Sequence, residues 1–173
     1  MKIRVPAPRD SGLLLWMQKV YGDQAPEAWQ KLAAKTVTVT KGWSEAYGLF
    51  LKGESDLVLS YTTSPAYHMI EEKKDNYAAA NFAEGHSSAG RSCRAYRRQQ
   101  AAGTGGKFLK FMVSPGFQNA IPTGNWMYPV TQVTLPAGFD TLVKPQTTLS
   151  FTPQQVASER QTWISAWQRA VSR

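Results

Sequence analysis

Cysteine is almost absent from this sequence of 173 residues, in which Cys93 stands alone. One cysteine excludes an internal disulfide framework, and it excludes a metal knuckle built on a CxxC pair. No apolar run is long enough to cross a bilayer, and the N-terminal stretch MKIRVPAPRDSG lacks the apolar core of a signal peptide. We therefore expect no membrane insertion, and we expect the chain as given to stay in the cytoplasm. Its length suits one domain of ordinary size.

Large apolar residues are missing from one internal segment. Between Ser87 and Gly106 there is no Val, Ile, Leu, Met or Phe. Because such a segment cannot bury apolar area, we expect it to be a loop or disordered. The net charge is +8, and basic residues crowd this segment and the N-terminus: Lys2, Arg4, Arg9, Arg91, Arg94, Arg97 and Arg98. This positive charge leaves open a basic nucleic-acid-binding module.

The most informative stretch is residues 55–68, SDLVLSYTTSPAYH. Its apolar run, 57–59, favours a short buried strand of an α/β sheet. The hydroxyl residues YTTS follow, and then Pro65, which favours the first turn of a helix capped by Thr63 or Ser64. Hydroxyls at such a turn predict an anion site, because N–H groups and the helix dipole point at the ligand. The same residues also suit an ordinary capped joint.

The rest of the chain alternates helical and extended patterns, which indicates the α/β class. Helices are expected over 13–20, 26–35, 44–52, 65–74, 107–114 and 115–121, and the longest is expected to begin at Thr152 and Pro153. Strands are expected at 36–40 and 77–82, a turn at 122–125, irregular chain at 1–11, and extended, proline-broken chain at 129–151. In the longest helix one stripe should face the core: Val156, Trp163, Ile164 and Trp167.

Several of these segments resemble one family: LLLWMQKVYG, KTVTVTKGWSEAYGLFLKGESDLVLSYTTSPAYH, FMVSPGFQNAIPTGNWMYP and WISAWQRAVSR. Through them the chain resembles the periplasmic thiamine-binding proteins of ABC importers, a group of type II solute-binding proteins. The match corresponds to the C-terminal half of that family. It implies an incomplete type II periplasmic-binding-protein fold with parts of both lobes. Residues 12–74 would belong to the second lobe, and residues 75–173 would form the C-terminal part of the first.

Two segments depart from the family, 1–11 and 87–106, and one explanation covers both. Codons for KIRVPAPRDSG can read DPRTSTPGLG in another frame, and codons for residues 87–105, shifted by one base, can read PAQVEVAARTAASKQPELA. Family members have closely similar sequences at both places. We therefore infer a frameshifted fragment, from a decayed gene or a sequencing error, and we expect the upstream DNA to encode the missing part in another frame. The basic clusters are then frame products, which removes most support for nucleic-acid binding.

The resemblance implies a site for thiamine, thiamine monophosphate or thiamine diphosphate, with no cofactor and no metal. Trp43, Tyr61 and Trp126 would border the ligand, and Tyr67 would lie close by. Aromatic faces suit the thiazolium cation and the pyrimidine ring of such a ligand. These aromatic residues could equally be core residues, as most Trp and Tyr side chains are.

Phosphate recognition should depend on hydroxyl groups. Thr62, Thr63 and Ser64 match a hydroxyl-bearing turn that resembles half of the family's phosphate clamp. The other half resembles the Ser-Thr pair of an RTSTPG loop, but this chain has Ala7 and Pro8 there. Each lost charge-assisted hydrogen bond is typically worth about 1.5–3 kcal/mol. We therefore expect thiamine binding by this chain to be weak or absent.

No pattern in the sequence supports catalysis well, so we predict a binding protein and not an enzyme. Ser64 lacks a nucleophile-elbow context, and His68 faces Glu71 or Glu72 across what should be a solvated helix surface. The predicted function is part of the substrate-binding component of a thiamine importer, periplasmic by family and partnered by the importer's permease. A small α/β phosphate-ester enzyme using the YTTS turn stays open as the alternative.

Overall fold

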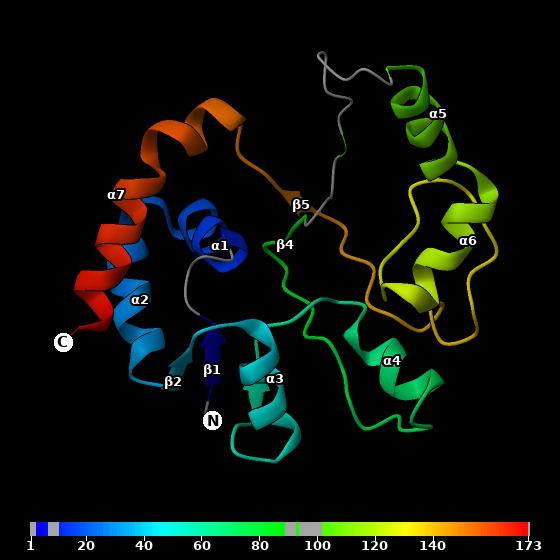
Figure 1. Cartoon of the computed structure of the whole chain (residues 1–173). Coiled ribbons are helices and arrows are strands. Elements are labelled where there is room, and N and C mark those ends of the chain that lie inside the picture. Colours follow the sequence, from blue (N-terminus) through cyan, green and yellow to red (C-terminus); the bar gives the residue numbers. More distant parts are fainter. Residues whose placement is uncertain (1–2, 7–10, 89–92, 94–101, 173) are drawn as a thin grey trace. The chain divides into compact units, whose positions relative to one another are not determined.

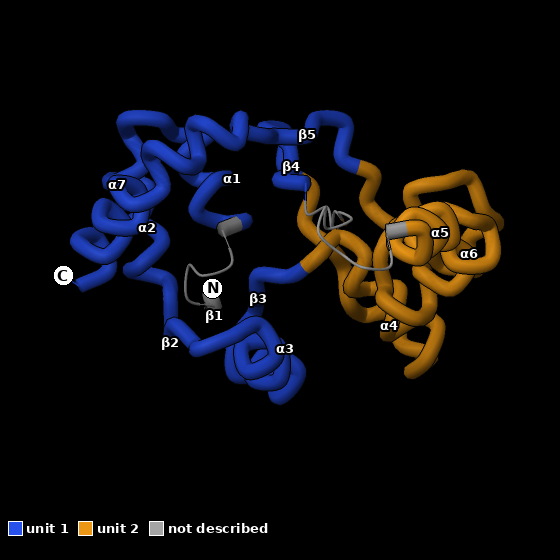
Figure 2. Tube along the Cα trace, turned by 45° about the horizontal axis from the view of Figure 1, so that its top comes forward, with its two compact units in different colours: residues 1–60, 82–89, 145–173 blue, residues 61–81, 90–144 orange. Residues whose placement is uncertain are grey.

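The chain alternates short strands with helices, as the computed structural model shows for residues 3–6, 11–88, 93 and 102–172 (Figure 1). This open mixed arrangement confirms the predicted α/β class. Two compact units interleave along the sequence (Figure 2): unit 1 comprises residues 1–60, 82–89 and 145–173, and unit 2 comprises residues 61–81 and 90–144. These bounds differ from the predicted division into residues 12–74 and 75–173. That these two ranges belong to the two lobes of the family's fold stays a prediction.

Unit 1 contains a three-stranded parallel sheet with the strand order β2-β1-β3. The strands are β1 (Ile3–Pro6), β2 (Thr36–Thr40) and β3 (Leu57–Val58). The prediction of irregular chain at 1–11 is therefore wrong for residues 3–6, because strand neighbours on both sides satisfy the backbone of this short segment. The strand predicted at 57–59 is confirmed over Leu57–Val58. Its predicted burial is wrong, because Leu57 is 43% exposed on β3, an edge strand of the three-stranded sheet among the described residues.

A second, two-stranded parallel sheet joins distant parts of unit 1, β4 (His86–Ser87) and β5 (Thr148–Leu149). Gly85 precedes β4 with a φ of +104°, and a Cβ atom there would lie 2.7 Å from the Thr147 carbonyl oxygen. Only glycine fits this close approach without displacing the neighbouring strand. The indole Nε1 of Trp16 donates a hydrogen bond to the Gly85 carbonyl oxygen at 2.8 Å.

The helices of unit 1 build its core. They are α1 (Ser11–Tyr21), the 3-10 helix η1 (Gly22–Gln24), α2 (Ala25–Ala33), α3 (Trp43–Leu51) and α7 (Pro153–Val171). Leu14 and Met17 of α1, Trp29 of α2 and Trp163 of α7 are buried in one cluster. Of the predicted stripe on α7, Trp163 is buried and Ile164 and Trp167 pack against this cluster.

The start of α7 confirms the prediction made from Thr152 and Pro153. The Thr152 hydroxyl accepts a hydrogen bond from the Gln155 N–H, and the Gln155 side chain accepts one from the Thr152 N–H. This reciprocal capping box satisfies two N–H groups that the first helical turn would otherwise leave unpaired.

Unit 2 is helical in the part of the chain that the structure describes. It contains α4 (Ser64–Ile70), α5 (Ala102–Met112) and α6 (Pro115–Gly124). Its buried core is small and consists of Ala66, Phe139 and Leu142, with Met69, Ile70 and Trp126 packed against it.

Four predictions of local structure are wrong in unit 2 or next to it. The helix expected over 65–74 ends at Ile70, because Lys73 takes a positive φ of 56° and the Lys74 N–H bonds back to the His68 carbonyl. The turn expected at 122–125 is helical through Gly124: buried Pro122 donates no N–H, but its fixed φ is accommodated and the Asn125 N–H closes the last turn on the Ile121 carbonyl.

The other two predictions are the loop expected over 87–106 and the strand expected over 77–82. Residues 102–106 begin α5 and are not a loop, although most of 87–101 lies outside the described residues. No strand forms at 77–82, where Ala and Asn, which are poor strand formers, dominate the sequence NYAAANF.

Candidate ligand-binding site

The hydroxyl turn at residues 61–64 connects β3 to α4, as predicted. Thr63 is the N-cap residue of α4, but its side chain makes no capping hydrogen bond. Instead the Thr63 hydroxyl donates to the Trp126 carbonyl oxygen at 2.6 Å, and Thr63 is 3% exposed. The turn is therefore fastened to a residue far away in the sequence. Since this proton is already donated, Thr63 can offer a ligand only an acceptor at its oxygen.

Two aromatic side chains of unit 2 meet beside this turn. The rings of Tyr67 and Trp126 lie edge to face, with centroids 5.2 Å apart and planes at 88°. Tyr67 is 40% exposed, and Tyr61, at the start of the turn, is also exposed. We call Tyr67, Trp126 and the turn 61–64 the aromatic corner. It brings six of the seven predicted site residues together in one unit: Tyr61, Thr62, Thr63, Ser64, Tyr67 and Trp126.

Trp126 reaches this position through an uncommon backbone conformation. Its φ is 53°, in the left-handed region that non-glycine residues seldom adopt. The preceding α6 ends with the Asn125 N–H bonded to the Ile121 carbonyl, and the chain then reverses. Neither the sequence PTGN nor the tryptophan itself predicted this conformation, and the role of Trp126 at a ligand site stays a prediction.

Trp43, the remaining predicted residue, belongs to unit 1. It begins α3, its ring stacks on Tyr47 at 4.9 Å, and its Nε1 donates to the Ser60 hydroxyl at 3.0 Å. Trp43 is 36% exposed, so it is an accessible aromatic face and not a core residue. The stacking of Tyr47 on Trp43 was not predicted, although the i,i+4 spacing of the two residues on a helix is a signal for it.

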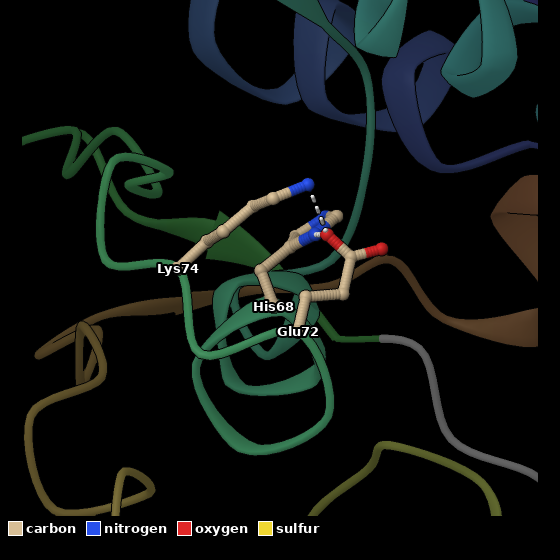
Figure 3. Close-up of polar contacts among 3 residues, drawn as sticks. All are labelled: His68, Glu72 and Lys74. Atoms are coloured by element: carbon tan, nitrogen blue, oxygen red, sulfur yellow. Dashed lines mark hydrogen bonds and ion pairs between the residues drawn. The ribbon is translucent and has the colours of Figure 1, made fainter.

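The buried His68 contacts the corner through Tyr67, with the two ring centroids 5.3 Å apart, which the sequence did not predict. His68 is fully buried, and its ring centroid lies 4.0 Å from that of Tyr77. Its Nδ1 lies 2.9 Å from Oε2 of Glu72, and Lys74 Nζ lies 3.1 Å from the same oxygen (Figure 3). The expectation of a solvated histidine is therefore wrong, because the chain after α4 folds back and places Tyr77 over the ring.

The charges around His68 are arranged to keep Glu72 ionised. Hydrogen bonds from His68 and then from Lys74 hold the pKa of the Glu72 carboxyl below its ordinary value. Glu72 in turn raises the pKa of the Lys74 ammonium. An ionised carboxylate can only accept, so Nδ1 of His68 carries the proton in this contact. These contacts link His68 of α4 to Glu72 and Lys74, just after the end of the helix.

Metal-binding groups and membrane-spanning helices were the other features considered in the part of the chain that the structure covers. Its residues contain no group of three or more His, Cys, Asp or Glu that could hold a metal ion. Among the same residues, no helix combines the length and apolar character required to cross a membrane.

Comparison with known proteins identifies the relatives of the chain, although no family model matches it. The thiamine-binding periplasmic protein of Salmonella typhimurium is 76% identical over 166 residues, which cover 94% of this chain and 50% of the relative. The proteins of the same name from Escherichia coli and Haemophilus influenzae are 75% and 47% identical over 166 residues, covering 94% of this chain and 50% and 49% of the relatives. A solved structure described as a periplasmic thiamin binding protein matches with a TM-score of 0.88 and 69% identity, over 99% of this chain and 55% of that chain.

The open α/β fold and the solved neighbour define the class, that of periplasmic binding proteins. Within it, the chain is homologous to the thiamine-binding periplasmic proteins and spans about half of their length. The resemblance stated from the sequence is confirmed. The relatives are named as binding proteins, which does not favour the alternative phosphate-ester enzyme. The two frameshifts stay a prediction.

Proposed function

We propose that this chain forms part of the thiamine site of a periplasmic binding protein that delivers its ligand to the permease of an ABC importer. The observation that carries the proposal is the identity of 76% and 75% with two proteins named for thiamine binding. The aromatic corner supports it, because a cationic ring needs accessible aromatic side chains of this kind.

Within the corner, Tyr67 and Trp126 would contact the rings of thiamine. Their edge-to-face contact fixes both ring planes, so little side-chain freedom remains to be lost on binding. Tyr61 is a further exposed aromatic of unit 2 that we assign to the same ligand, and the predicted role of Trp43 in unit 1 stays a prediction.

The hydroxyl groups of Thr62 and Ser64 would donate to a phosphate of the mono- or diphosphate ester. Thr63 would instead position the turn, because its hydroxyl already donates to Trp126. This division of roles within one turn predicts that the three hydroxyl residues respond differently to mutation.

Affinity for the phosphate esters should be low, because half of the expected phosphate clamp lacks its hydroxyl groups. Ala7 and Pro8, which lie outside the described residues, have no hydroxyl where the family resemblance has a Ser-Thr pair. Two lost charge-assisted bonds would cost about 3–6 kcal/mol, or roughly two to four decades in affinity.

Ligand-detected NMR with thiamine, followed by calorimetry with thiamine and its two phosphates, tests the proposal. We expect saturation transfer to thiamine that Trp126→Ala and Tyr67→Ala abolish. Phe108→Ala, which removes an exposed aromatic ring from α5 of the same unit, is the matched control and should change nothing. No transfer at millimolar thiamine would refute the proposal. Nanomolar binding of the phosphate esters would retain the proposal and refute the argument for low affinity.

A further inference from the structure

The chain that follows α6 contains Trp126 and belongs to no helix or strand over residues 126–130. Side chains hold both ends of this segment. At one end the Thr63 hydroxyl donates to the Trp126 carbonyl oxygen. At the other end the Val130 N–H donates to Oε1 of Gln118 at 2.8 Å. Because Trp126 has a φ of 53°, its conformation persists only with support of this kind.

The side-chain amide of Gln118, on α6, makes a second hydrogen bond. Its Nε2 donates to the Met112 carbonyl oxygen at 2.7 Å, in the last turn of α5, where helical carbonyls lack a partner within the helix. Gln118 is 5% exposed, so water cannot readily replace either bond. The two bonds also fix the orientation of the amide, because only its oxygen can accept and only its nitrogen can donate. Gln118 thereby connects the end of α5 to the segment 126–130.

The residues between Val130 and Trp126 transmit this restraint. The ring of Pro129 fixes its φ, which removes one backbone rotation from the short connection. The Tyr128 ring packs edge to face against Phe139, which is fully buried, with the ring centroids 5.8 Å apart. Because the segment is short and restrained, release of its far end should change the position of Trp126.

We propose that Gln118 is a positioning residue for Trp126. By fixing the Val130 end of the segment, it keeps the Trp126 ring edge to face with Tyr67, with the ring centroids 5.2 Å apart. The ligand role of Trp126 belongs to the proposed function, on which the effect of Gln118 on thiamine binding rests. A purely structural role, in which Gln118 only ends α5 or fills space, predicts no specific effect on Trp126.

Gln118→Met tests this role, because it keeps the length of the side chain and removes both hydrogen-bonding groups. The readout is the indole N–H resonance of Trp126 in the full chain labelled with nitrogen-15 tryptophan, without ligand and assigned through Trp126→Phe. We expect Gln118→Met to shift or broaden this resonance and to leave the tryptophan resonances of unit 1 unchanged. The matched control is Ser114→Ala, which removes the N-cap hydrogen bond of the same helix and should not move the Trp126 resonance.

Gln118→Glu provides a rescue. At about pH 5 a buried carboxyl group stays largely protonated. It then accepts from the Val130 N–H and donates to the Met112 carbonyl, as the amide does. Gln118→Glu should therefore keep the wild-type Trp126 resonance at this pH, whereas Gln118→Met should not. An unchanged resonance in Gln118→Met, an equal change in Ser114→Ala, or a Gln118→Glu variant that matches Gln118→Met would each overturn the proposal.

Thiamine titration followed by ligand-detected NMR measures the consequence for binding. Gln118→Met should weaken binding at least about tenfold, and Ser114→Ala should stay within about twofold of the wild type. Coupling between two events is reciprocal, so thiamine should in turn slow hydrogen exchange of the Val130 amide in the wild-type chain, a measurement that remains if Gln118→Met fails to fold. Unchanged exchange at saturating thiamine would also overturn the proposal. If the wild type binds no thiamine, the proposed function fails, whereas the ligand-free Trp126 resonance still decides the role of Gln118.

Discussion

The hydrogen bond from Thr63 to Trp126 provides a sharp test of how the aromatic corner is maintained. Thr63→Val preserves the shape of the side chain and removes the hydroxyl that donates to the Trp126 carbonyl at 2.6 Å. Thr63 is 3% exposed, so water cannot readily replace the lost donor. Trp126 also has a φ of 53°, a conformation that persists only when its surroundings stabilise it.

The expected loss follows from these two facts. A buried acceptor left without its partner costs about 1–3 kcal/mol, more than the net value of an average hydrogen bond. Since 1.4 kcal/mol is a factor of ten, opening of the turn should become roughly 5- to 150-fold more frequent. Thr63→Ser retains the donor and should recover most of the stability.

Two measurements check this prediction. Urea unfolding followed by tryptophan fluorescence reports the stability difference between the variants, and native-state hydrogen exchange reports opening of residues 61–70. Thr63→Val should accelerate exchange in α4 and leave α7 of unit 1 unchanged. The reasoning would be refuted if Thr63→Val stayed within about 0.5 kcal/mol of the wild type, or if Thr63→Ser were equally destabilised.

Three further predictions concern other parts of the chain. Because the pKa of Glu72 is lowered in the folded state, its contribution to stability should be fully present above the ordinary carboxyl value of 4.5 and should disappear as pH falls through the lowered value. The difference in melting temperature between the wild type and Glu72→Gln should therefore shrink over the same pH range, and a difference that does not change with acid pH would contradict this. Thr152→Ala removes the capping box of α7 and should cost about 0.5–2 kcal/mol in urea unfolding, whereas Thr152→Ser should cost little. Genomic sequencing should show that the codons for residues 87–105, read shifted by one base, encode a family-like strand segment; a frame with no such similarity would remove the frameshift inference.

The sequence predicted those helices and strands whose formation depends on residues that are neighbours in the chain. The N-cap at Thr152, the alternating TVTVT of β2 and the proline-led start of α6 each specified an element without reference to the rest of the chain. The errors arose where long-range contacts decided the outcome. Residues 3–6 became a strand through pairing with two distant strands, and α4 ended early where Lys73 and Lys74 turn back on His68.

The same distinction between local patterns and long-range contacts applies to the candidate site. Aromatic and hydroxyl residues could be selected from the sequence because their chemistry and the family resemblance point to one ligand class. The bond between Thr63 and Trp126, 63 positions apart, could not be predicted from spacing. Burial of His68 was equally inaccessible, because it depends on Tyr77 folding over the ring after α4 has ended.

The unit 1 core combines residues from distant parts of the chain, which affects how the chain folds during translation. Leu14 and Met17 belong to α1, whereas Trp163 of the same cluster belongs to α7, 146 positions after Met17. A ribosome adds about 5–20 residues per second, so Leu14 and Met17 wait roughly 7–30 seconds for Trp163. During translation their apolar faces remain without this partner, and the chain in this interval should depend on chaperones more than the finished protein does.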